Sequence, residues 1–93
     1  MYSLVEIYCI VHGKVQNVGY RDFVQRSAKK HSVTGWVQNK EDGTVEICAQ
    51  GIPDDLKSFV EELNSGSVLA EVESVAVDWR TPEKHFDDFI VIF

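Results

Sequence analysis

One stretch joins a predicted strand to a predicted helix and reads His12-Gly13-Lys14-Val15-Gln16-Asn17-Val18-Gly19-Tyr20-Arg21. Its two glycines let the backbone take conformations that other residues avoid. A loop that ends at a helix N-terminus presents unpaired N–H groups and the positive end of the helix dipole, which both favour an anion. Arg21 falls in the first helical turn, where its guanidinium is placed to bind a phosphate. Spacing alone leaves open an ordinary strand-to-helix turn with a surface arginine.

Hydrophobic periodicity defines the elements on both sides of this stretch. Residues 4–12 alternate, which predicts a strand with one buried face. Residues 20–31 follow helical spacing, and Lys29 and Lys30 suit the negative end of the helix dipole. The side chains expected inside are Val5, Ile7, Cys9 and Val11 of the strand, and Phe23, Val24, Ser27, Ala28 and His31 of the helix.

A hairpin and a second helix are expected in the middle of the chain. Asp42-Gly43 is a strong hairpin signal, and it separates predicted strands at residues 33–39 and 44–50. Pro53 suits the first turn of a helix, and Gly66 ends the helical pattern. Leu56, Phe59, Val60 and Leu63 form the apolar face of this helix.

The last part of the chain completes the expected fold. Two more strands are predicted at residues 72–79 and 86–93, which gives the order β-α-β-β-α-β plus a final strand. This order predicts a ferredoxin-like α+β sandwich, in which an antiparallel sheet carries two helices on one face. We expect residues 1–93 to form a single domain. The fold assigns no function by itself, because many unrelated activities use it.

The charge of the chain is unevenly distributed along its 93 residues. The formal net charge is −6, but residues 1–40 carry a net +4 and residues 41–93 a net −10. The negative total argues against a nucleic-acid-binding surface, which would be broadly basic. The basic segment contains the glycine-bounded loop and Arg21. The distribution therefore favours a compact anionic ligand over a polymer.

The two cysteines indicate neither a disulfide framework nor a metal site. Cys9 belongs to the apolar set of its strand and Cys48 to the polar set of its own, so we expect them on opposite faces of the sheet. No Cys-x-x-Cys pair or Cys/His cluster suggests a metal ligand set. The apolar start of the chain is interrupted by Glu6 and is too short to span a membrane. We expect a cytoplasmic protein without membrane partners, and nothing in the sequence demands more than a monomer.

Two sequence blocks carry a resemblance to a known family. Gly13-Lys14-Val15-Gln16-Asn17-Val18-Gly19-Tyr20-Arg21 resembles the acylphosphatase signature G-[RK]-V-Q-G-V-G-[FY]-R. Gly35-Trp36-Val37-Gln38-Asn39 resembles that family's second block, G-W-V-x-N, and residues 42–46 resemble the hairpin that follows it. The resemblance covers essentially the whole chain, and the two blocks together are highly specific. It implies hydrolysis of acyl phosphates to a carboxylate and inorganic phosphate, without a metal or a cofactor.

The resemblance also implies a role for each site residue. Arg21 and the loop amides would hold the phosphoryl group, and Asn39 would position the attacking water. The loop residues with this role are Val15, Gln16, Asn17, Val18, Gly19 and Tyr20. One of them departs from the signature, which normally has Gly where this chain has Asn17. Because Asn tolerates positive φ, we expect the loop shape to be kept.

Two alternatives stay open at this point. The first is a non-catalytic phosphate- or anion-binding regulatory module of the same fold. The second is a domain that works inside a larger carbamoyl-phosphate-handling protein, which a self-contained chain of 93 residues disfavours. Both would bind an anion at the loop, but the first would not turn over an acyl phosphate.

Overall fold

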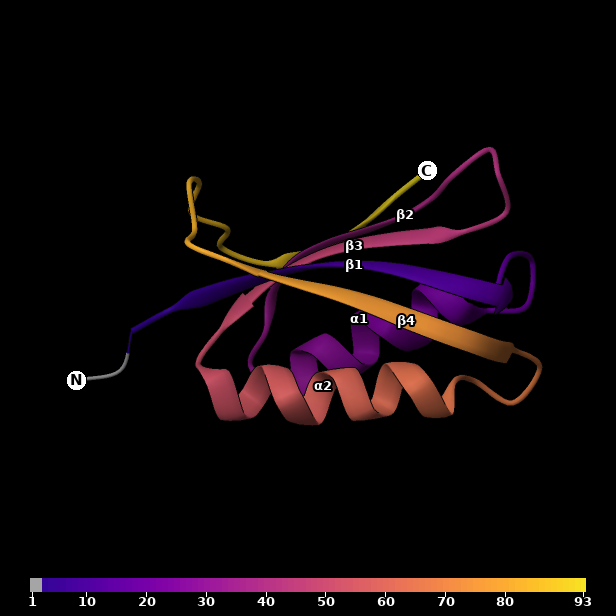
Figure 1. Ribbon diagram of the computed structural model, residues 1–93, viewed down its shortest axis with the longest axis horizontal. Helices are drawn as coiled ribbons and strands as arrows, with labels where there is room; N and C mark the ends of the chain where they lie inside the picture. The colour runs from indigo at the N-terminus through magenta and orange to yellow at the C-terminus, as the bar shows by residue number, and fades with distance from the viewer. Residues whose placement is uncertain (1–2) are drawn as a thin grey trace.

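The computed structural model describes residues 3–93 and contains five strands and two helices (Figure 1). In chain order these are β1 Val5–Lys14, α1 Tyr20–Lys30, β2 Thr34–Asn39, β3 Val45–Gly51, α2 Pro53–Ser65, β4 Glu71–Arg80 and β5 Phe89–Ile92. The order is the predicted β-α-β-β-α-β succession with a final strand, and the ferredoxin-like α+β fold is confirmed.

The five strands form one sheet in the order β4-β1-β3-β2-β5. The pairs β4–β1, β1–β3 and β3–β2 are antiparallel, but β5 runs parallel to β2, so the sheet is mixed rather than purely antiparallel as predicted. β5 runs parallel to β2 because β4 ends at the end of the sheet where β2 begins. Arg80 pairs with Glu6 at the end where β2 begins. From there the chain crosses the end of the sheet and enters β5 beside Gly35, in the direction of β2.

Both helices cover the same face of the sheet, and the core lies between the two layers (Figure 1). The faces predicted from periodicity are confirmed. The fully buried side chains on this face include Ile7, Cys9 and Val11 of β1, Val24 and Ala28 of α1, and Leu56, Phe59 and Leu63 of α2. Burying one large apolar side chain contributes about 1.5–3 kcal/mol, so this layer dominates the stability of the fold.

The two cysteines lie on opposite faces of the sheet, as predicted. Cys9 pairs with Ile47 on the helix-covered face, whereas Cys48 pairs with Tyr8 on the open face. Both thiols are free and buried, and desolvation raises the pKa of each to about 12. They are therefore packing residues of two separate layers.

The carboxylate of Glu62 ties the two helices together. It lies on α2 and accepts hydrogen bonds from Ser27 and, at 2.7 Å, from the Lys30 ammonium of α1. His31 Nε2 lies 3.0 Å from the same carboxylate. The bonds from Lys30, Ser27 and His31 lower the pKa of Glu62 to about 2. Glu62 is thus a charged contact that holds α1 against α2.

A second polar network closes the end of the sheet where β2 begins. Gln50 is only 1% exposed, although it belongs to the polar face of β3. Its Nε2 donates to Glu6 Oε1 at 2.9 Å and to the carbonyl oxygen of Lys84, and its Oε1 accepts from Phe86 N at 3.4 Å. The segment 81–88 is therefore folded over this end of the open face.

Two strand ends differ from the prediction by two residues or more, whereas the others agree within one residue. β1 continues through Gly13 and Lys14, with a register shift between His12 and Gly13 where it pairs with β4. Gly13 has φ +130, and a Cβ there would lie 2.1 Å from the carbonyl oxygen of Glu71, so only glycine fits this close approach. β5 begins at Phe89 rather than at Phe86, because the Phe86 amide bonds to the Gln50 side chain instead of a strand.

Candidate active site

The loop between β1 and α1 holds two residues in the left-handed backbone conformation. Asn17 has φ 60 and Gly19 has φ 76, which confirms that Asn adopts positive φ at the position where the signature has Gly. Gly19 is also the N-cap of α1, and no side chain caps this helix start. Within the described residues, the first-turn N–H groups thus have no side-chain cap, and such groups carry the positive end of the helix dipole.

Arg21 reaches from α1 to the last strand. Its Nη1 donates to the carbonyl oxygen of Ile92 at 2.9 Å, and its guanidinium carbon lies 4.7 Å from the centre of the Phe93 ring. A guanidinium has five N–H donors, so the bond to Ile92 leaves several for a ligand. β5 therefore fixes the direction of the Arg21 side chain without using up its capacity to bind an anion.

Asn39 is the last residue of β2 and meets Arg21 in one pocket. The pocket has a volume of about 520 Å³, and Arg21 and Asn39 both line it. Oδ1 of Asn39 is buried and has no hydrogen-bond partner within residues 3–93. An unpaired buried carbonyl costs about 1–3 kcal/mol, so a hydrogen bond from a ligand or a water would be favourable at this atom.

The six predicted loop residues divide into two groups. Val15, Asn17, Gly19 and Tyr20 line the pocket with Arg21 and Asn39, whereas Gln16 and Val18 are not among its lining residues. Val18 is half-buried against the core, and its carbonyl oxygen accepts a hydrogen bond from Ser67 at 3.3 Å. The Tyr20 side chain is buried and donates to the Leu63 carbonyl at 2.8 Å, so it anchors the helix. The assigned role of these residues concerns their backbone N–H groups and stays a prediction.

Gln16 connects the loop to the hairpin that carries Asn39. Its Nε2 donates to the carbonyl oxygens of Lys40 at 2.7 Å and Thr44 at 2.9 Å. Lys40 directly follows Asn39, and its N–H also bonds to the Thr44 carbonyl at 2.9 Å. The Gln16 side chain thus fixes the distance between the loop and the end of β2.

Five further residues line the pocket and were not predicted as site residues. They are Asp22 and Gln25 of α1, and Ile90, Val91 and Phe93 at the end of the chain. No motif marks them. Those at the end of the chain reach the site because β5 joins the sheet beside β2, next to α1, and this neighbourhood depends on the topology of the final strand.

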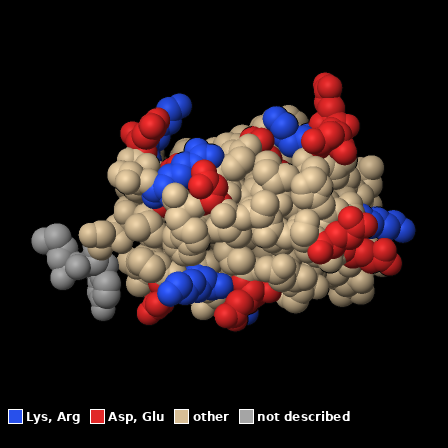
Figure 2. Space-filling view, viewed as in Figure 1, with Lys and Arg blue, Asp and Glu red and all other residues tan. Residues whose placement is uncertain are grey.

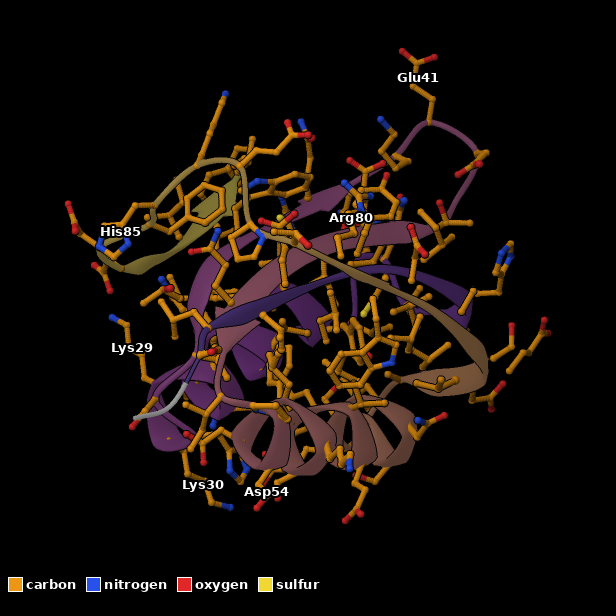
Figure 3. The ribbon with its side chains drawn as sticks, turned by 60° about the vertical axis from the view of Figure 1, so that its left-hand side comes forward. Lys29, Lys30, Glu41, Asp54, Arg80 and His85 are labelled. Carbon is orange, nitrogen blue, oxygen red and sulfur yellow. The ribbon has the colours of Figure 1, made fainter. Side chains whose placement is uncertain are left out.

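The charge at the pocket is small and local. Arg21 is the one basic residue and Asp22 the one acidic residue among the side chains that line it. Lys29 and Lys30, which contribute to the basic N-terminal segment, lie in the last turn of α1, where Lys30 pairs with Glu62, whereas Glu41 stands at the hairpin tip (Figure 3). On the face drawn in Figure 2, basic side chains are scattered among acidic ones and form no continuous patch. Arg21 and the N-terminus of α1 are therefore the groups that make the pocket locally positive.

Within residues 3–93, no group of three or more His, Cys, Asp or Glu side chains is arranged to hold a metal ion. Over the same residues, neither helix has the length and apolar character needed to cross a membrane.

Comparison with known proteins gives a consistent result. The model of the acylphosphatase family matches residues 7–91. An acylphosphatase from Bacillus licheniformis is 47% identical over 90 residues, which cover 97% of this chain and 100% of the relative. The crystal structure of acylphosphatase from Bacillus subtilis superposes with a TM-score of 0.93 and 38% identity, over 96% of this chain and 99% of that one. The T. kodakarensis HypF structure has a TM-score of 0.82 and 34% identity over 94% of this chain, but over only 12% of its own.

Proposed function

Because the chain belongs to the acylphosphatase family, we propose that the pocket between α1 and β5 is where it hydrolyses acyl phosphates. The observation that carries this assignment is the buried, unpaired Oδ1 of Asn39 in the same pocket as Arg21 and the uncapped start of α1. One group can accept a bond from water, and the other two can bind an anion. These are the two functions that hydrolysis of a phosphate ester or anhydride requires.

The phosphoryl group is held by the loop amides and Arg21. A phosphoryl-transfer transition state spreads negative charge over its equatorial oxygens, so fixed donors aimed at these oxygens supply most of the catalysis. We propose the backbone N–H groups of residues 15–20 and the remaining N–H groups of Arg21 as these donors, since Val15, Asn17, Gly19, Tyr20 and Arg21 line the pocket. The contact of Arg21 with Ile92 positions the guanidinium before the substrate arrives.

Asn39 orients the water. An amide side chain cannot remove a proton at neutral pH, but its oxygen can accept a hydrogen bond and direct a water lone pair toward phosphorus. The water oxygen forms a bond to phosphorus, and the bond from phosphorus to the acyl oxygen breaks. The carboxylate leaves with the electron pair. One proton of the water passes to a phosphoryl oxygen and the other stays on the attacking oxygen, so the products are a carboxylate and dihydrogen phosphate.

This route needs no protein acid or base. The leaving carboxylate is a weak base with a pKa of about 4, so it departs without protonation. The bound phosphate itself accepts the proton of the water. Loss of turnover on replacing a histidine or carboxylate near the pocket would show instead that a protein base takes part.

Hydrolysis of benzoyl phosphate, followed by absorbance with a chelator present, tests the proposed function. The wild-type chain is expected to turn over. Arg21→Gln should lose substrate binding and rate, whereas Asn39→Ala should keep its inhibition constant for inorganic phosphate and lose rate. Glu83→Gln, in the segment at the other end of the sheet, is the control with unchanged activity.

Two outcomes would overturn the assignment. Phosphate binding without turnover in the wild type would favour a non-catalytic anion-binding module. Turnover only after addition of a metal ion would contradict the proposed use of Arg21 and the loop amides.

We also propose that the chain works as a monomer in the cytoplasm on small acyl phosphates, without a nucleic-acid partner. The test of the first point is its molar mass by light scattering.

A further inference from the structure

The pocket is larger than its phosphate-binding end. The loop, Arg21 and Asn39 supply part of the lining, and the rest comes from α1 and from β5 with Phe93. Its volume of about 520 Å³ is in the range of sites that enclose a whole small ligand. If the phosphoryl group is bound as proposed above, the acyl group lies in this second part.

The two walls of the acyl part differ in chemistry. β5 and the residue after it supply Ile90, Val91 and the Phe93 ring, which form an apolar wall. α1 supplies Asp22 and Gln25 on the opposite side. Nε2 of Gln25 is engaged with the Phe89 carbonyl at 2.9 Å. Asp22 therefore carries the one full charge on this part of the wall.

The Asp22 carboxylate is available to a ligand. It pairs with Arg26, one turn further along α1, at 3.0 Å, and both side chains are 70% exposed. An exposed pair of this kind is weak, so it leaves the carboxylate ionised and accessible. Asp22 lines the pocket, whereas Arg26 is not among the pocket-lining residues.

We propose that Asp22 makes the site selective for the charge of the acyl group. This inference rests on the proposed function, because it needs the phosphoryl end fixed at Arg21. Acyl phosphates whose acyl group is neutral or carries a cation are accepted. Those with a second anionic group on the acyl side are disfavoured by repulsion from Asp22. Two charges 4 Å apart interact by about 1 kcal/mol in water, which sets the effect on each charged substrate at about three- to fivefold.

A purely structural role for Asp22 makes a different prediction. An acid in the first turn of a helix stabilises it through the dipole and the pair with Arg26. Its removal would then lower the melting temperature and leave the choice between substrates unchanged. A ratio of rates on two substrates separates the two roles, because loss of folded protein cancels from that ratio.

The test uses two rigid substrates, 4-carboxybenzoyl phosphate and 4-(trimethylammoniomethyl)benzoyl phosphate. Neither can cyclise, and differences in leaving-group reactivity cancel when variants are compared. We expect Asp22→Asn to lower the ratio of kcat/KM, cationic over anionic, about 10- to 25-fold relative to wild type, because it removes both the attraction for the cationic substrate and the repulsion of the anionic one. Asp22→Glu should restore it, and 1 M salt should shrink the effect. Glu83→Gln makes the same change in net charge at the distant end of the molecule and should leave the ratio unchanged (Figure 1).

The outcomes distinguish this inference from the proposed function. Turnover of both substrates with the same ratio in wild type and Asp22→Asn would overturn the role of Asp22 and leave the enzyme assignment intact. An equal shift in Glu83→Gln would show that overall charge alone is responsible, which also overturns it. If the wild type turned over neither these substrates nor benzoyl phosphate, the proposed function itself would fail.

Discussion

At the pocket end of the sheet, Oδ1 of Asn39 is buried without a hydrogen-bond partner, whereas at the opposite end the amide of Gln50 is bonded through both its nitrogen and its oxygen. The helix start at Gly19 has no side-chain cap, and Asn17 beside it takes a left-handed conformation. Between the helices, by contrast, Glu62 is bonded to three side chains.

This difference separates groups that stabilise the fold from groups that serve a ligand. A satisfied buried polar group contributes about 0.5–1.5 kcal/mol, whereas an unsatisfied one costs about 1–3 kcal/mol. The chain tolerates that cost where the missing partner is a ligand or water. Substitutions at the two ends should therefore separate activity from stability.

Asn39→Ala should produce the largest effect, and only on activity. Removing the water-orienting oxygen is expected to lower kcat about 100-fold, by analogy with the loss of one preorganised polar group in an active site. Because the atom has no partner to lose, the free energy of unfolding should stay equal or rise slightly. Denaturant unfolding and steady-state kinetics on the same preparation measure both. A fall in stability comparable to the fall in activity would contradict the comparison.

Gln50→Leu, at the opposite end of the sheet, should lower stability and leave activity unchanged. It removes the bonds to Glu6 and to the segment 81–88, and it leaves the Glu6 carboxylate buried with Arg80 at 3.9 Å. We expect a loss of about 2 kcal/mol in the free energy of unfolding, measured in urea. The kcat of the folded fraction should be unchanged. A large fall in kcat with intact stability would show that the two ends are coupled.

Glu62→Gln should lower the free energy of unfolding by about 1–2 kcal/mol at pH 7. This loss is smaller than that of Gln50→Leu because the Lys30 partner is largely exposed. The pKa of Glu62 is lowered from 4.5 to about 2 on folding. Its contribution is therefore complete above pH 4.5 and is lost as the pH falls toward 2. Urea unfolding should show that the difference in unfolding free energy between wild type and Glu62→Gln is smaller at pH 3 than at pH 7. A difference independent of pH would mean that the ionised carboxylate is not responsible.

Asn17→Gly should have the smallest effect. Glycine adopts the left-handed backbone of this position more readily and restores the residue usual in the signature. Phosphate affinity, measured as the inhibition constant for inorganic phosphate, should be equal or slightly tighter. A clear loss of affinity would show that the Asn17 amide itself contacts the ligand in the pocket that it lines.

The sequence predicted the two ends of the molecule unequally. The loop, Arg21 and Asn39 were identified by the two sequence blocks, and the structure brings Arg21 and Asn39 into one pocket. Helical and strand periodicity located both helices and the buried face of β1 because these elements each pack against a single layer. The Asp42-Gly43 hairpin followed from local turn chemistry, and Asp42 accepts hydrogen bonds from Thr44 there.

What escaped prediction depends on contacts between distant segments. The alternation of β3 placed Gln50 on its polar face, but no local pattern shows that residues 81–88 fold over it. The direction of β5 and its place beside β2 follow from where β4 ends in the assembled sheet. The apolar wall of the pocket and the positioning of Arg21 by Ile92 both depend on that placement.

The strand that completes the pocket is also the shortest in the sheet. β5 has four residues, pairs with β2 alone and lies at the edge. Transient detachment of β5 would remove the apolar wall and the carbonyl that holds Arg21, while β1, β2, β3 and β4 stay paired. The pocket therefore depends on the pairing of this edge strand, and a substrate that contacts β5 would stabilise that pairing.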